Sequence, residues 1–163
     1  MAIISKEKQS VKANWPIQKI QQEMTRIIAS KIITRLRFME NGNEAFIEKF
    51  EKISAEQVAN AFKKSGVKTP LDLVEHMAER AANLFGAQVQ YAGDARSATL
   101  FNEKPTVWLE AKKNANMNVK QEQLMHKHYE NWQRDLASAF GFSAKVEITN
   151  NGDSSIVTFT KTA

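Results

Sequence analysis

The eight residues MHKHYENW, Met125 to Trp132, bring together two histidines, a tyrosine and a tryptophan. An imidazole can ligate a metal or move a proton, whereas a phenol or an indole can form an apolar pocket wall that carries one polar atom. No other stretch of the 163 residues gathers so many such groups. The stretch could therefore be a metal site, a ligand-binding site or the edge of a packed helix.

The spacing of the two histidines argues against a metal site. His126 and His128 are two positions apart, so on a helix their side chains point about 200° away from each other. The third histidine of the chain, His76, is distant in the sequence, and a metal would need several convergent ligands. We therefore expect no metal site.

Helical spacing places Met125, Tyr129 and Trp132 on one face, and His128 borders that face. In one interpretation His128 is a structural histidine at the edge of the core. In the other, His128 and Tyr129 are polar anchors of a mostly apolar pocket, the usual composition of a ligand site. Trp108 and Trp132 would then form walls, and Arg96 would contact a polar end of the ligand. The candidate ligand-binding residues are His128, Tyr129, Trp132, Trp108 and Arg96.

The composition limits the chemistry further. The chain has no cysteine, which excludes disulfides, thiolate metal sites and cysteine nucleophiles and is typical of a cytoplasmic protein. No glycine-rich phosphate loop and no nucleophile arrangement of serine and histidine is present. Nothing indicates catalysis or a particular cofactor, although a site assembled from residues distant in sequence would leave no motif.

The positive charge is concentrated at the start of the chain. Residues 1–39 contain eight Lys or Arg against two acidic residues, so the other residues sum to −1 of the net +5. Such a segment could be a solvated helix face, could dock on an acidic partner, or could bind nucleic acid. Nucleic acid is the less favoured partner, because no aromatic residues alternate with the basic ones.

Residues 1–14 are polar with an apolar run of only three, so we expect a mobile lead-in rather than a signal peptide or membrane anchor. Residues 15–163 are expected to form one domain, with a helical part at 16–86 and a sheet-plus-helix part at 87–161. Pro16 opens a helix that ends at 41–43. It is long enough to serve as the seam of a homodimer. Its apolar positions are Ile17, Ile20, Met24, Ile27, Ile28, Ile32, Leu36 and Met39.

Three more helices are expected before the sheet. One begins near Glu44, and another begins at Ser54, where Ser-Ala-Glu-Gln has the spacing of a capping box. The next begins after Thr69, with Pro70 at its first position, and ends at Gly86.

After Gly86 the spacing of the apolar residues changes from the helical pattern to the alternation typical of strands. We expect strands around 89–91, 98–101 and 106–109, an exposed loop at 112–118 and a helix from 119 to 140 stopped by Gly141. A hairpin of residues 145–149 and 155–160 follows. The predicted fold is α+β: N-terminal helices and an antiparallel sheet of about five strands packed against a long C-terminal helix, in the order αααα-βββ-α-ββ.

From about residue 70 to 160, and most clearly in HYENWQRDLASAFGFSAKVEITNNGDSSIVTFT, the chain resembles the four-vinyl-reductase-type small-molecule-binding domains and the aminothiazoline-carboxylate-hydrolase-like proteins. The shared pattern is a helix with Tyr129 and Trp132, a stop at Gly141 and two strands around the turn at Gly152. The resemblance implies a pocket between sheet and helices for a small apolar or carboxylate-bearing molecule, and often a dimer. The cysteines of many such relatives have no counterpart here, so their thiol chemistry does not carry over.

Taken together, these features predict a non-catalytic small-molecule-binding or sensing domain with its pocket between the last long helix and the sheet. The alternative is a structural or assembly protein that oligomerises or docks an acidic partner through its basic first helix.

Overall fold

The computed structural model describes residues 12–163. The expected mobile lead-in at 1–14 therefore lies almost entirely outside the described residues, and residues 12–16 have no regular secondary structure. The elements that follow are α1 (Ile17–Phe38), η1 (Met39–Asn43), α2 (Glu44–Lys64), α3 (Pro70–Phe85), β1 (Gln88–Gly93), β2 (Ser97–Lys104), α4 (Thr106–Ala115), α5 (Val119–Phe140), β3 (Phe142–Thr149), η2 (Asn150–Gly152) and β4 (Ser154–Lys161).

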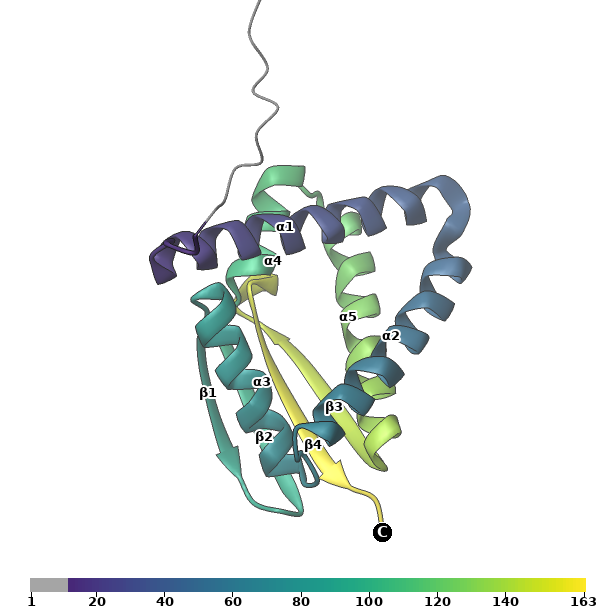
Figure 1. The fold of residues 1–163 in the computed structure, drawn as a ribbon. Coiled ribbons are helices and arrows are strands. Elements are labelled where there is room, and N and C mark those ends of the chain that lie inside the picture. The colour runs from purple at the N-terminus through teal and green to yellow at the C-terminus, as the bar shows by residue number, and fades with distance from the viewer. Residues whose placement is uncertain (1–11) are drawn as a thin grey trace, which may run out of the picture.

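The predicted α+β class is confirmed, with four strands among the described residues instead of about five. They form one antiparallel sheet in the order β1-β2-β4-β3. Helix α3 packs on β1 and β2, α5 packs on β3, and α2 runs beside α5. Helix α1 lies across α3 and α4, at one end of the molecule (Figure 1).

Local signals explain the best-predicted boundaries. The Thr69 hydroxyl accepts a hydrogen bond from the Asp72 backbone N–H, and the Asp72 carboxylate accepts one from the Thr69 N–H in return. This capping box, with Pro70 in the first turn, fixes the start of α3 as predicted. Gly86 ends α3 and Gly141 ends α5, both with a left-handed backbone that glycine adopts without a steric penalty.

The expected strand at 106–109 is wrong, because these residues open helix α4. Their β-branched and aromatic side chains favour a strand, but good helix formers follow them, and Ala111 is fully buried in a cluster with α1. The loop expected at 112–118 is shorter than predicted, because α4 continues to Ala115.

The helix start expected at Ser54 is also wrong, because α2 is continuous from Glu44 to Lys64. Its buried face keeps one helical phase through the Ser54 region, so tertiary packing overrides the local capping signal. The residues on that face are Ile47, Glu51, Ala55, Ala59 and Phe62. The element order is therefore ααα-ββ-αα-ββ.

The buried apolar residues form two clusters. One lies between the sheet, α3, α5 and the end of α2, and includes Leu73, Leu136 and Phe159. The other joins α1, α4 and the first turns of α2 and α5, and includes Leu36 and Ala111. Helix α1 thus packs against its own chain. None of the described helices combines the length and the apolar composition needed to cross a membrane.

Candidate ligand-binding cavity

A cavity of about 300 Å³ lies at the junction of the two clusters. Ile32 of α1 and Trp108 of α4 contribute from the second cluster, whereas Leu100 of β2 contributes from the first. The complete lining is Ile32, Met77, Ala81, Leu100, Asn102, Pro105, Val107, Trp108, Met125, His126, Tyr129, Gln133, Ile148, Gly152, Ser154 and Ser155. Its volume lies at the lower end of the range of small-molecule sites.

The strand register places polar groups at the sheet end of this cavity. Alternate residues of β2 and β4 face the helices, and the register pairs Leu100 with Val157 and, one step along, Asn102 with Ser155. The Asn102 side-chain amide donates to the Ser155 hydroxyl over 3.1 Å and to the Tyr129 hydroxyl over 3.3 Å. The two hydroxyls lie 3.1 Å apart. The three side chains therefore form a closed triangle of hydrogen bonds on the cavity wall.

Gln133 follows Tyr129 by one helical turn and is only 2% exposed. Its Oε1 has no hydrogen-bond partner among the described residues. Burial raises the pKa of the Tyr129 hydroxyl, and the side chains of Ser155, Gln133 and Asn102 oppose that effect. Tyr129 is therefore neutral at physiological pH, and its neighbour Gln133 is a buried amide with an unmade hydrogen bond.

The β3–β4 turn borders the cavity and is held by side chains from α4 and α5. The Trp108 indole donates to the Gly152 carbonyl oxygen over 2.8 Å, and Nε2 of His126 lies 3.1 Å from the same oxygen. The Lys112 ammonium contacts Asp153 at 2.8 Å and Glu122 at 3.1 Å. These two carboxylates raise the pKa of Lys112, so its positive charge is neutralised locally.

A second cavity of about 430 Å³ adjoins the first and reaches α1 and α2. Among its lining side chains are Arg35, Glu51 and His128, together with Trp132. The two cavities share five lining residues: Ala81, Pro105, Val107, Tyr129 and Gln133. Tyr129 and Gln133 therefore lie at the boundary between an apolar chamber and a charged one.

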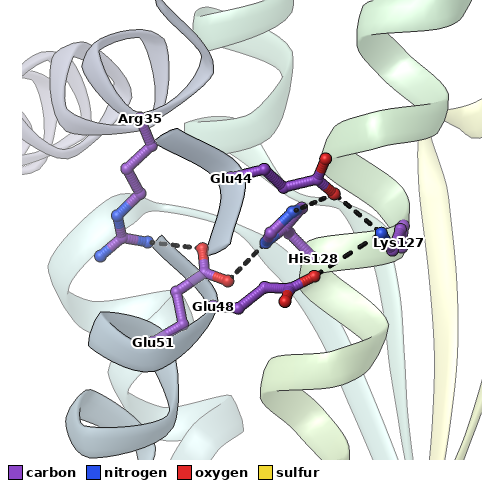
Figure 2. Close-up of polar contacts among 6 residues, drawn as sticks. All are labelled: Arg35, Glu44, Glu48, Glu51, Lys127 and His128. Carbon is purple, nitrogen blue, oxygen red and sulfur yellow. Dashed lines mark hydrogen bonds and ion pairs between the residues drawn. The ribbon is translucent and has the colours of Figure 1, made fainter. Parts of the chain in front are cut away.

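The charged chamber borders a cluster of ionic groups, shown in Figure 2. His128 is buried, with Nδ1 2.7 Å from the Glu51 carboxylate and Nε2 3.3 Å from that of Glu44. Arg35 lies 4.0 Å from the other Glu51 oxygen. The Lys127 ammonium lies 2.7 Å from Glu44 and lowers the pKa of that carboxyl through this hydrogen bond.

Three groups of this cluster could chemically hold a metal ion. Glu44, Glu48 and His128 each offer one ligand atom within 4.8 Å of the others, the sole such group among the described residues. However, the Lys127 ammonium already contacts both carboxylates, at 2.7 Å for Glu44 and 3.6 Å for Glu48. A cation of this chain thus already neutralises the carboxylates on which a metal would depend.

The structure places four of the five predicted site residues around the two cavities. Trp108 and Tyr129 line the first, and His128, Tyr129 and Trp132 line the second. Arg96 lies elsewhere, in the exposed β1–β2 turn, where its backbone contacts Asp94 and Lys161. It is not brought to either cavity.

Among the polar lining residues that the sequence did not predict are Asn102, Gln133 and Ser155 of the first cavity and Glu51 of the second. Each continues an apolar pattern: Asn102 extends the alternation of Ala98 and Leu100, and Gln133 follows Tyr129 by four positions. The same holds for Ser155 before Val157, and for Glu51 between Ile47 and Ala55. A polar residue in phase with a buried face was the signal that could have found them.

The sequence matches no family model and no curated protein. Among solved structures, the chain is similar to a trafficking protein particle complex subunit 3 from Naegleria fowleri, covalently bound to palmitic acid. The identity is 13%, the TM-score is 0.57, and the match covers 87% of this chain and 97% of that one. An Fe(II) unliganded H-NOX protein from K. algicida is 13% identical over 89% of this chain and 96% of that one, with a TM-score of 0.40. At this identity the first likeness shows a shared fold alone, and the second is too distant to carry an argument.

Proposed function

We propose that the protein is a non-catalytic small-molecule-binding or sensing domain whose ligand occupies the cavity between α5 and the sheet. The observation that carries this proposal is the buried Gln133, whose Oε1 has no partner among the described residues although its side chain borders a mostly apolar cavity. An unmade hydrogen bond of a buried group is costly, so it is retained most simply where a ligand completes it.

Two further points support the proposal. The resemblance to four-vinyl-reductase-type domains, which stays a prediction, implies a pocket at this place. The trafficking-complex subunit with the same fold holds an apolar acyl chain. This chain has no cysteine and therefore cannot hold an acyl chain as a thioester. We propose that its ligand binds reversibly and noncovalently. The lack of cysteine also keeps the reducing cytoplasm as the proposed compartment.

The test is the binding of N-phenyl-1-naphthylamine, a neutral fluorophore that brightens in apolar pockets. We expect saturable binding by the wild type and loss of that binding in Ala81→Phe, because Ala81 borders both cavities and the ring would fill the space between them. Ala61→Phe, at an exposed position of α2, is the matched control and should bind normally. Equal binding by both variants, once each is shown to be folded, would contradict the proposed site.

A second candidate function is assembly, for which the exposed apolar residues of α1 and α2 are the specific observation. They are Ile17, Ile20, Ile27, Phe38, Phe46, Phe50 and Ile53. On α2 the spacing of Phe46, Phe50 and Ile53 follows one helical face. A homo-oligomer would cover it. Docking of an acidic partner is less favoured, because Arg26, Arg35 and Arg37 each lie within 4.0 Å of a glutamate of this chain. Light scattering should show a multimer that Phe50→Glu dissociates; a wild-type monomer would contradict this candidate.

A further inference from the structure

We infer that the ligand is an uncharged amphiphile, an apolar body that ends in a group able both to donate and to accept a hydrogen bond, as an alcohol or a primary amide does. This inference rests on the proposed function and specifies its ligand. It departs from the sequence-based expectation, which allowed an apolar molecule or a carboxylate.

The charge of the residues that line the first cavity indicates that the ligand is uncharged. Within the described part of the chain, no Lys, Arg, Asp or Glu lines the first cavity. The nearby Lys112 is already neutralised by Asp153 and Glu122. His126 is the one imidazole of the lining, and its Nε2 already lies 3.1 Å from the Gly152 carbonyl oxygen. An anion placed there would lose its hydration without gaining a permanently charged counterion, which is strongly unfavourable.

The second chamber does not supply the missing counterion. Arg35 lies against Glu51, and His128 lies between Glu51 and Glu44. A carboxylate that entered this chamber would meet the Glu51 carboxylate beside both Arg35 and His128. The two negative charges would repel each other, so the second chamber disfavours an anionic ligand end as well.

The hydrogen bonds on the cavity wall leave one donor and one acceptor unused. The Tyr129 and Ser155 hydroxyls each carry one proton, and both accept a hydrogen bond from Asn102. Only one of the two protons can lie between the hydroxyls, so the other has no acceptor among the contacts of the described residues. This pair therefore has a spare donor on the cavity wall, and the lining residue Gln133 beside it has a spare acceptor, its buried Oε1.

A ligand hydroxyl satisfies both spare groups, because its oxygen accepts from the pair and its proton goes to Gln133. A carboxylate has no proton to donate and would leave Gln133 unpaired. The rest of the lining sets the other half of the ligand: Ile32, Met77, Leu100, Val107, Met125 and Ile148 provide an apolar surface for a hydrocarbon body.

Calorimetric titration of the full chain with decan-1-ol and with decanoate at pH 7.5 tests the inference, since the two probes share one chain length and differ in the polar end. We expect the alcohol to bind at least tenfold more tightly, a difference of about 1.4 kcal/mol. Ala81→Phe should abolish alcohol binding, which assigns it to the cavity. Decanoate binding equal to or tighter than alcohol binding would overturn the inference and leave the proposed function standing.

A matched pair of variants tests the role of Gln133. Gln133→Met keeps the shape of the side chain and removes the amide, and we expect it to weaken decanol binding roughly tenfold, as the loss of one buried hydrogen bond should. Gln123→Met makes the same change at an exposed position of α5 and should leave the affinity unchanged. Unchanged affinity in Gln133→Met would overturn the assigned hydrogen bond. Binding of neither probe by the wild type would contradict the proposed function and, with it, this inference.

Discussion

The carboxylate of Glu51 lies 2.7 Å from Nδ1 of His128, and both side chains are buried between α2 and α5. Removing the Glu51 carboxylate would leave the buried imidazole of His128 without this hydrogen-bond partner. We predict that Glu51→Ala lowers the free energy of unfolding by about 3 kcal/mol, and that Glu51→Gln, which keeps a hydrogen-bonding group in place, costs less. Urea unfolding measures both. Glu56→Ala, at an exposed site of the same helix, is the control and should change the free energy of unfolding little. A similarly small change in Glu51→Ala would contradict the prediction.

The Gln133 amide should lower the stability of the protein without ligand and strengthen the binding of ligand. Without ligand, Gln133→Met removes a buried polar group that has an unmade hydrogen bond, so we predict that it raises the free energy of unfolding by about 1 kcal/mol. Gln123→Met should shift the urea midpoint little, because surface substitutions are usually close to neutral. A destabilised Gln133→Met protein would show that the amide supports the fold rather than a ligand.

Gly152 combines two constraints at the turn that borders the cavity. Its φ of +92° favours glycine, and an added Cβ would lie 2.9 Å from Cε1 of His126. Gly42 has a similar φ of +84° but nothing within 4 Å of an added Cβ. We predict that Gly42→Ala costs about 1 kcal/mol through backbone strain alone, and Gly152→Ala more. Thermal unfolding of the two variants compares them, and equal losses would show that contact with His126 is unimportant.

The Asp72 carboxylate should make the free energy of unfolding depend on pH in the acid range. The backbone N–H of Lys68 and the contacts with Thr69 lower its pKa below the ordinary value of 3.8. Because the folded-state pKa is depressed, the stabilisation is complete above about pH 4 and is lost as the pH falls through the lowered value. We predict that Asp72→Asn is less stable than the wild type at pH 7, and that the difference shrinks at pH 3. A difference of the same size at both pH values would contradict this origin.

Both ends of α3, the end of α5 and the last hairpin could be predicted because their signals are local. Thr69 with Pro70, and the glycines at 86 and 141, act on their own few residues, and the structure keeps them. The α4 helix could not be predicted in this way, because Ala111 is buried against α1, which is distant in the sequence. Local propensity favoured a strand there, and packing decided otherwise.

The candidate site was predicted in part for the same reason. Tyr129, Trp132 and His128 share a short helical stretch, so periodicity groups them. Asn102 and Ser155 meet Tyr129 only through the pairing of β2 with β4, which no single stretch of sequence displays. The cavity itself lies between two clusters that five helices and the sheet create together.

The central claim is that the cavity holds a small molecule. Its most direct test is the native mass spectrum of freshly purified protein, recorded beside the denatured spectrum and beside native Ala81→Phe. We expect an excess mass on the native wild type that disappears on denaturation and is absent from the variant. A native wild-type mass equal to that of the bare chain or its multiple, with unchanged stability when neutral amphiphiles are added, would contradict it.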